Sequence, residues 1–253
     1  MSRFTGKKAV VTGGTHGMGL AIVEALLAEG AEVVLTGRNE RTLEEARSTL
    51  RGRAAHVVRS DAASMADIAG LADIAQRELG RVDHLFVNHG IAEFAELAEV
   101  TEESWDRHFA VNTKGAFFTV QALAPLLREG GSLVFTTVGN DVVFPGLSAY
   151  SASKEAMRAF AHVLAAEFLP RGIRVNSVAP GFIKTPTMGV AGLTEEQRRE
   201  FERQGDESTP LGRNGTVEEV ASAALFLAAD ATFTTNVELA VDGGFAQGLV
   251  SAH

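Results

Sequence analysis

Residues 10–30, VVTGGTHGMGLAIVEALLAEG, pass from a β-branched apolar run through a glycine-rich turn into a segment with helical spacing. Leu20, Val23 and Leu27 recur at i, i+3 and i+7, as on one face of a helix. Glycines permit a tight turn and close backbone approach, so a pyrophosphate can sit against the free N–H groups of the helix. The stretch therefore predicts a phosphate-binding strand–turn–helix unit, and a plain turn between strand and helix is the alternative.

The same alternation continues along the chain. Short apolar runs lie at 8–12, 32–36, 55–60, 82–88, 131–137, 173–179 and 237–244. Segments of helical character separate them, and those at 17–29, 64–79, 101–128 and 148–169 are the clearest, with Thr101 as an expected N-cap. The strands are almost continuously apolar, as expected when helices cover both faces of a parallel sheet. The fold class we predict is α/β, a doubly wound parallel sheet of about seven strands.

Composition limits the classes of function. The 253 residues are 45% hydrophobic and 22% charged, contain no cysteine and carry a formal net charge of −9. We expect no disulfides, no nucleic-acid partner and no metal site, since the seven histidines form no ligand-spaced cluster. No signal-like segment opens the chain and no apolar run is long enough to span a membrane, so we expect a cytoplasmic protein. We predict a single domain over 1–253, with a polar substrate lid at about 185–215.

The residues after the second strand bear on the cofactor. The run LTGRNE at 35–40 has no carboxylate where an NAD site would need one for the ribose hydroxyls, and Arg38 follows instead. A guanidinium suits a 2′-phosphate, and His16 in the glycine turn adds to this locally. We predict NADP(H) as the preferred cofactor; NAD(H), with Arg38 as a solvated loop residue, is the alternative.

Further motifs follow the glycine turn in order: VNHG at 87–90, Asn at 112, YSASK at 150–154, PGFIKTP at 180–186 and VDGG at 241–244. With all six, the chain resembles the short-chain dehydrogenase/reductases from Lys7 to about Gly248. The resemblance implies a Rossmann-like fold, hydride transfer with a nicotinamide cofactor, and a homotetramer or dimer. Val87 and His89 depart from the usual Asn-Asn-Ala-Gly motif.

The resemblance also implies a cofactor site, residue by residue. Asp61 and Ala62 would lie at the adenine, Asn88 and Gly90 at the adenosine ribose, and Ile183 and Thr185 at the nicotinamide carboxamide. The full set of expected cofactor-binding residues is Gly13, Thr15, His16, Gly17, Met18, Gly19, Arg38, Asp61, Ala62, Asn88, Gly90, Tyr150, Lys154, Pro180, Gly181, Ile183 and Thr185.

Tyr150 and Lys154 stand four residues apart at the head of a predicted helix, so both side chains can point into one cleft. Reduction of a ketone needs an acid for the developing alkoxide, but a free phenol has a pKa of roughly 10. An ammonium at ~4 Å would favour the phenolate by up to about 4 kcal/mol at an effective dielectric of ~20. We therefore predict Tyr150 as acid/base and Lys154 as its partner, with Asn112 holding a water that links Lys154 to solvent.

A fourth catalytic residue is less clearly placed. The resemblance implies a serine about 13 residues before the tyrosine, which falls on Thr137; counting forward from the strand start reaches Val138. We assign Thr137, because only a hydroxyl can bind the substrate carbonyl. Thr136 and Ser148 are weaker substitutes.

The substrate is expected to be a neutral, fairly apolar carbonyl compound or alcohol. Candidate lining residues are Phe94, Phe144, Leu147, Met188 and Val190, for which ordinary packing is the alternative. We predict an NADP(H)-dependent oxidoreductase that reversibly reduces a ketone or aldehyde. The alternative is a non-catalytic NADP(H)-binding regulator, and the Tyr-x-x-x-Lys spacing disfavours an enoyl reductase. Trp105, Phe109 and Phe160 are expected either in subunit contacts or in the core.

Overall fold

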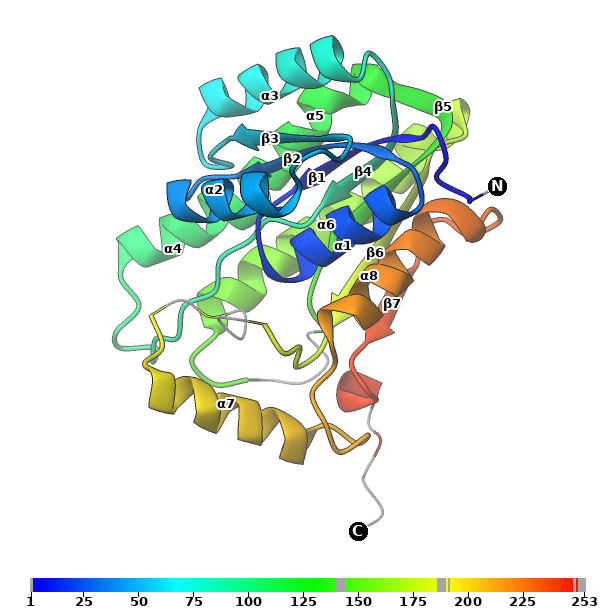
Figure 1. Ribbon diagram of the computed structural model, residues 1–253. Coiled ribbons are helices and arrows are strands. Elements are labelled where there is room, and N and C mark those ends of the chain that lie inside the picture. Colours follow the sequence, from blue (N-terminus) through cyan, green and yellow to red (C-terminus); the bar gives the residue numbers. More distant parts are fainter. Residues whose placement is uncertain (1, 140–143, 186–189, 191, 248, 250–253) are drawn as a thin grey trace.

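Seven parallel strands form one sheet in the computed structural model, which describes residues 2–139, 144–185, 190, 192–247 and 249 (Figure 1). The strands are β1 (Lys8–Thr12), β2 (Glu32–Gly37), β3 (Ala55–Arg59), β4 (Val82–Val87), β5 (Leu127–Thr136), β6 (Arg174–Pro180) and β7 (Glu238–Val241). Their order is β3-β2-β1-β4-β5-β6-β7. The strand order reverses between β1 and β4, and a crevice at such a point is where ligands bind in open α/β sheets. The predicted fold class is confirmed.

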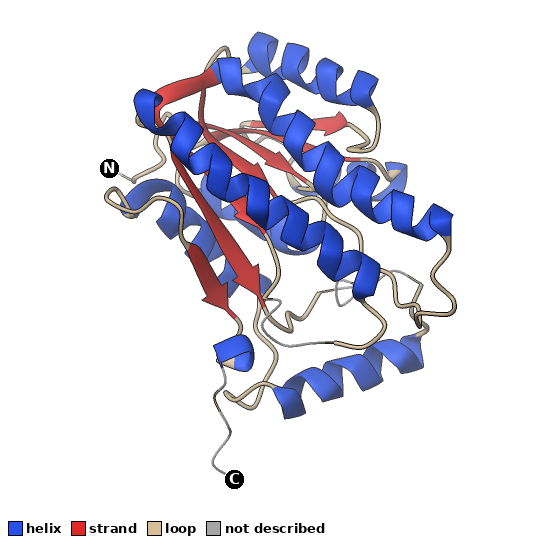
Figure 2. Ribbon diagram, turned by 180° about the vertical axis from the view of Figure 1, so that it is seen from behind, coloured by secondary structure: helices blue, strands red, loops and turns tan. Residues whose placement is uncertain are grey.

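Helices cover both faces of this sheet. On one face lie α1 (Gly17–Ala28), α2 (Glu40–Thr49) and α8 (Val217–Leu225); on the other lie α3 (Met65–Glu78), α5 (Ala116–Leu123) and α6 (Ser148–Phe168). Figure 2 shows this second layer from its outer side. The remaining helices are α4 (Glu102–His108) and α7 (Glu195–Ser208), which lies beyond the carboxyl ends of the strands within the predicted lid region.

The two layers enclose two apolar cores. Along β1 and β2, Val11 and Val33 are buried on the side of α1 and α8, whereas Val10 and Val34 are buried on the side of α3, α5 and α6. Successive residues of a strand point to opposite faces, so these strands must be apolar throughout. This explains the continuous apolar runs in the sequence.

The predicted helix over 101–128 is interrupted. Thr101 caps α4 as expected, its side chain accepting a hydrogen bond from the Ser104 N–H. A π-helical segment (Phe109–Gly115) then joins α4 to α5, and a 3₁₀ turn (Ala124–Leu126) ends the run. Such a segment accommodates an extra residue in the helix and often accompanies a functional site. Asn112 lies within it.

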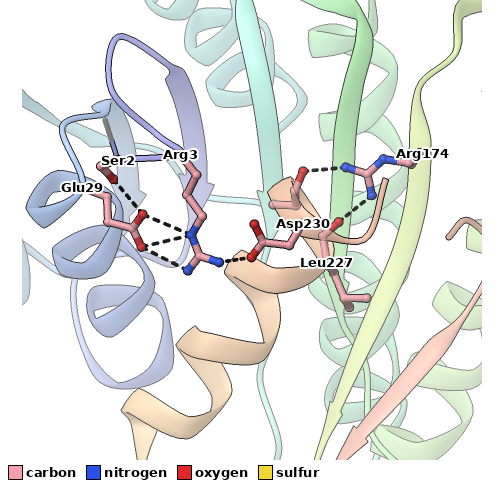
Figure 3. A network of polar contacts seen from close by, with 7 residues as sticks. Ser2, Arg3, Glu29, Arg174, Leu227 and Asp230 are labelled. Carbon is pink, nitrogen blue, oxygen red and sulfur yellow. Dashed lines mark hydrogen bonds and ion pairs between the residues drawn. The ribbon is translucent and has the colours of Figure 1, made fainter. Parts of the chain in front are cut away.

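Polar contacts tie the chain together at the opposite, amino-terminal edge of the sheet (Figure 3). Arg3 pairs with Glu29, at 3.0 Å, and with Asp230. Arg174, the first residue of β6, donates to the carbonyl oxygens of Leu227 (2.6 Å) and Ala231 (3.0 Å). The guanidinium thereby satisfies carbonyl groups that the end of a helix leaves unpaired. The candidate site lies at the other edge of the sheet, at the carboxyl ends of the strands.

No helix in the described ranges has both the length and the apolar character needed to cross a lipid bilayer.

Candidate active site

The glycine turn packs too closely for larger residues. Gly13 and Gly17 have φ of +64° and +54°, which side chains disfavour. A Cβ at Gly19 would lie 2.0 Å from the Gly13 carbonyl oxygen, and one at Gly13 would lie 2.9 Å from the Cα of His89. Gly13 and Gly19 are thus required by contacts of the turn with itself and with the residues after β4, and Gly17 by its positive φ.

The helix that follows the turn begins without side-chain capping. His16 occupies the N-cap position of α1 but makes no capping hydrogen bond, and the first turn contains no acidic residue. By contrast, Asn39 and Ser64 cap α2 and α3. The uncapped N–H groups and the positive end of the helix dipole fit a cofactor phosphate. Met18, in the first turn of α1, packs against the core beside α8.

Arg38 stands just after β2, with its side chain 54% exposed and its Nη1 4.0 Å from the Asp61 carboxylate. The other Asp61 oxygen accepts from the Ala63 N–H at 3.0 Å. The Thr15 hydroxyl lies 3.1 Å from that of Thr42 and 3.4 Å from His16 Nδ1. The residues predicted to bind the adenosine half of the cofactor thus lie together at one side of the candidate site.

His16 contributes less positive charge than its position in the sequence suggests. Burial, followed by the nearby Arg41 guanidinium, lowers the pKa of the His16 imidazole. The ring is therefore suited to hydrogen bonding rather than to charge pairing with a phosphate.

Asn88 and His89 join the end of β4 to β1. The Asn88 amide donates to the Gly13 carbonyl oxygen (3.1 Å) and its Oδ1 accepts from Thr136. His89 Nδ1 lies 2.7 Å from Thr12 Oγ1, and burial followed by the charge of Lys154 lowers the pKa of this histidine to about 4. The departure from the usual motif is thus a neutral, buried ring beneath the glycine turn.

Asn112 is fully buried and connects three elements. Its Oδ1 accepts from the Ile91 N–H (2.8 Å), and its amide donates to the Ile91 carbonyl oxygen and to Ser153 Oγ, both at 2.9 Å. A Cβ at Gly90 would lie 3.3 Å from Asn112 Oδ1 and 3.1 Å from Lys154 Nζ. The loop after β4, the π-helical segment and α6 therefore converge over Gly90. Sequence reasoning missed Ser153, whose only signal was its place within YSASK.

Tyr150 and Lys154 lie in the first two turns of α6, as predicted. Lys154 is buried, and its ammonium donates to the Thr136 carbonyl oxygen at 2.8 Å. Burial lowers the pKa of Lys154 to about 8 and raises the pKa of Tyr150 to about 12. Burial is the one cause of the raised pKa of Tyr150, and the role of Lys154 in favouring the phenolate stays a prediction.

Thr137 follows β5 directly. Its hydroxyl lies 3.0 Å from the Val178 carbonyl oxygen and 2.7 Å from Glu238 Oε2. The neighbouring Thr136 hydroxyl donates to Asn88. The catalytic role of Thr137 stays a prediction, and its contact with Glu238 was not foreseen.

The segment after β6 returns to the glycine turn. Pro180 ends β6, and a Cβ at Gly181 would lie 2.8 Å from the Cα of Asp242. Ile183 is buried, and Thr185 Cγ2 lies 3.6 Å from the position that a Cβ would take at Gly17. Thr185 Oγ1 is buried and finds no hydrogen-bond partner among the described residues. An unpaired hydroxyl beside the glycine turn fits a hydrogen bond to the carboxamide of a nicotinamide cofactor.

Ala62 also touches the central helices, since a Cβ at Gly115 would lie 2.3 Å from its carbonyl oxygen.

Aromatic rings gather beside α7, in the predicted lid region. Phe94 lies 5.9 Å from Phe144 and 5.5 Å from Phe201 of α7, between ring centroids. Phe182 contacts Phe144 and Phe201 as well, at 6.0 and 5.2 Å. Phe94, Phe144 and Phe201 border an open groove of about 780 Å³, which charged residues of α7 also line. Sequence analysis missed Phe182 and Phe201, although Phe201 is the only aromatic residue of its polar helix.

Of the other candidate lining residues, Val190 is buried and Leu147 half-buried. Met188 lies outside the described residues.

Comparisons with known proteins find reductases and dehydrogenases in each case. A family model described as "Enoyl-(Acyl carrier protein) reductase" matches residues 13–246. The chain is 36% identical to 2-(S)-hydroxypropyl-CoM dehydrogenase 3 of Xanthobacter autotrophicus, covering 96% of this chain and 98% of that protein. It is 34% identical to the NADP-dependent (R)-specific alcohol dehydrogenase of Lentilactobacillus kefiri, with the same coverage. A solved short-chain dehydrogenase/reductase from Serratia marcescens superposes with a TM-score of 0.87 at 30% identity, covering 96% of this chain and 99% of the other.

Proposed function

The chain belongs to the short-chain dehydrogenase/reductase family of oxidoreductases, and we propose that it reversibly reduces a neutral ketone or aldehyde with NADPH. The observation that carries the proposal is that Lys154 Nζ and Asn112 Oδ1 meet over Gly90, with Tyr150 one turn before Lys154 on α6. Dehydrogenases of alcohols among the relatives support this reaction class.

The preference for NADP(H) rests on the rim around Arg38. β2 ends in Thr36 and Gly37, with no carboxylate at this end for the ribose hydroxyls, whereas the exposed Arg38 guanidinium is available to a 2′-phosphate. Asp61, at 4.0 Å, lies close enough to orient this guanidinium. The NADP dependence stated in the name of the L. kefiri relative points the same way.

The bound nicotinamide would supply the hydride to the carbonyl carbon, or accept it from an alcohol. Tyr150 donates its phenolic proton to the carbonyl oxygen as negative charge develops there. Lys154 then stabilises the phenolate that remains, and a second lone pair of Asn112 Oδ1 is available to a water that returns the proton. The reverse steps oxidise an alcohol.

The pKa values of Tyr150 and Lys154 indicate that the proposed proton transfer needs a positive charge close to the phenol. With its pKa raised to about 12 by burial, Tyr150 is held in its protonated, donating form. A positive charge close to the phenol would favour its release of the proton, and Lys154 is the nearby cation on α6. Because burial lowers the pKa of Lys154 to about 8, this lysine can itself exchange a proton near neutral pH.

The proposed substrate is small enough to lie between the glycine turn and the aromatic groove. The rings of Phe94, Phe144 and Phe201 offer an apolar surface to the part of the substrate beyond the carbonyl. Charged and amide side chains of α7 line the same groove and offer polar contacts to the substrate.

An enoyl reductase is the second candidate, favoured by the description of the matching family model. The four-residue spacing of Tyr150 and Lys154 argues for carbonyl reduction instead. A non-catalytic NADP(H)-binding regulator is the third candidate. The observation that favours it is that the Thr137 hydroxyl, predicted to bind the substrate carbonyl, contacts Glu238 instead.

One set of assays distinguishes the three candidate functions. Purified protein is mixed with NADPH and, separately, NADH, and absorbance of the reduced nicotinamide is followed with ketones, aldehydes and an enoyl thioester. Turnover of carbonyls with NADPH is expected. Turnover of the enoyl thioester alone would favour the second candidate. NADPH binding with no turnover of any compound would favour the third.

We also propose assembly into a homotetramer or dimer through an aromatic face on α4, α5 and α6. Trp105 and Phe117 are 42% and 37% exposed, large fractions for such side chains. Phe117 lines an open groove of about 570 Å³ together with Phe109, Phe118 and Phe160. Trp105 stacks on Phe109, with 4.8 Å between ring centroids. Light scattering on the purified protein tests this assembly.

A further inference from the structure

The side-chain amide of Asn88 packs against the glycine turn. Its nitrogen donates a hydrogen bond to the Gly13 carbonyl oxygen at 3.1 Å. A Cβ at Gly13 would lie 3.3 Å from this nitrogen, and a Cβ at Gly19 would lie only 2.5 Å from it. The amide therefore fills the space beside both glycines, and its orientation bears on the shape of the turn.

A hydroxyl on the neighbouring strand sets that orientation. Thr136, the last residue of β5, donates from Oγ1 to Asn88 Oδ1 at 3.1 Å. Because a side-chain amide has its acceptor on one side and its donors on the other, this bond turns the donors towards Gly13. In the reversed amide two acceptor oxygens, Asn88 Oδ1 and the Gly13 carbonyl, would face each other with no proton between them. The single proton of the Thr136 hydroxyl is used in this contact, so Thr136 does not serve the substrate carbonyl.

Thr136 also holds Lys154, through a different group. Its backbone carbonyl oxygen accepts a hydrogen bond from Lys154 Nζ at 2.8 Å. The residue thus faces the glycine turn with its hydroxyl and the proposed acid/base pair with its carbonyl. A substitution of the side chain removes only the first of these contacts.

We infer that Thr136 is a positioning residue for the cofactor, because it fixes the Asn88 amide and, through it, the glycine turn against which the pyrophosphate would bind; this rests on the proposed function. Thr136 is only 5% exposed, so water does not readily take the place of its hydroxyl. Without the hydroxyl, the amide is free to turn away from Gly13. Thr136 itself touches neither cofactor nor substrate in this account.

The test compares two substitutions at this position. Thr136→Val removes the hydroxyl and keeps the branched shape of the side chain, whereas Thr136→Ser keeps the hydroxyl. We expect Thr136→Val to raise Kd for NADPH about fivefold, as for the loss of one neutral hydrogen bond. Kd for NADH should rise equally, because both cofactors share the pyrophosphate. Thr136→Ser should restore most of the affinity, and kcat at saturating NADPH should stay close to the wild-type value in both variants, because the carbonyl that holds Lys154 remains.

Ser132 provides a matched control on the same strand. Its hydroxyl is buried and lies 2.8 Å from His84 Nδ1, so it also joins β5 to a side chain of β4, but four residues before Thr136. Ser132→Ala should lower the free energy of unfolding and leave both Kd values unchanged. Equal rises of Kd in Ser132→Ala and Thr136→Val would overturn the inference, because a general loosening of the strand would then explain both.

A double-mutant cycle with Asn88→Ala locates the effect. In that background Thr136→Val should raise neither Kd further, because the amide that it positions is already gone. Three results would contradict the inference: unchanged Kd values in Thr136→Val alone, a rise for NADPH but not for NADH, or fully additive losses in the cycle.

Hydrogen exchange on the cofactor-free protein separates this inference from the proposed function. If the wild type reduces no carbonyl compound, the proposed function fails. Faster exchange of the backbone N–H groups at 13–19 in Thr136→Val than in the wild type would still support the positioning role. Identical exchange of these groups in the two proteins would show that the hydroxyl does not hold the turn.

Discussion

The ammonium of Lys154 donates a 2.8 Å hydrogen bond to the carbonyl oxygen of Thr136, the last residue of β5. This contact joins α6 to the edge of the sheet and fixes how far the lysine can reach. Because burial lowers its pKa to about 8, the lysine is poised to exchange protons in the physiological range.

Replacing Tyr150 by phenylalanine tests the proposed acid. Tyr150→Phe removes only the hydroxyl, so turnover should fall about 10²- to 10⁴-fold, as for other general acids. The affinity for NADPH, measured by fluorescence titration, should change little. Carbonyl reduction at the wild-type rate in the folded variant would exclude Tyr150 as the proton donor.

Gly90→Ala tests whether Lys154 and Asn112 must meet over this position. The added Cβ would lie 3.1 Å from Lys154 Nζ and 3.3 Å from Asn112 Oδ1. Displacing these groups should lower kcat about 10- to 100-fold, because small misplacements at a reacting centre are costly.

Gly70→Ala is the matched control, since a Cβ there meets nothing within 4 Å in the middle of α3. It should keep full activity and raise the free energy of unfolding by up to about 1 kcal/mol. Equal activity of the two variants would mean that Gly90 is not required by the site.

Arg38→Gln tests cofactor choice. If the guanidinium binds a 2′-phosphate, Kd for NADPH should rise about 10- to 100-fold, as for a hydrogen bond to a charged group. Kd for NADH should not change. Arg47→Gln on the outer side of α2 is the control, since Arg47 pairs with Glu40 and Glu44. Equal weakening of both cofactors by Arg38→Gln would argue against NADP selectivity at this residue.

Buried histidines should make the fold sensitive to acid. Burial lowers the pKa of both His84 and His89 from 6.5 to about 4. Between these values the unfolded chain binds more protons, so the free energy of unfolding falls as pH decreases from 6.5 towards 4. The full effect is about 3 kcal/mol per histidine.

Urea denaturation at a series of pH values measures this loss. His84 Nδ1 lies 2.8 Å from Ser132 Oγ in the core, away from Lys154 and Tyr150. His84→Gln should remove about one proton from the linkage between pH 6.5 and 4. An unchanged slope in that variant would show that His84 does not stay neutral in the folded protein.

Local patterns made the fold predictable. A continuously apolar strand, such as the one that contains Val33 and Val34, needs helices on both faces of the sheet. The glycine turn marked the start of α1. Tyr150 and Lys154 were predictable because their spacing fixes their relation within one helix. These inferences depend on short stretches of chain.

What the sequence did not reveal depends on tertiary contacts. The contact of Thr137 with Glu238 joins residues 101 positions apart, and no local pattern predicts the choice of rotamer. The pKa of Tyr150 is raised by burial, which depends on all the elements packed around it. Phe182 and Phe201 meet only because α7 folds back over the segment after β6.

The π-helical turn couples two surfaces of the molecule. Asn112 faces Ile91 and Ser153 within this turn, and the exposed ring of Phe117 follows a few residues later on α5. A regular α-helix advances about 100° per residue, so removing the surplus residue would rotate one surface relative to the other. The buried amide of Asn112 and the exposed ring of Phe117 therefore cannot change their helical phase independently, and insertions or deletions between 109 and 115 affect both together.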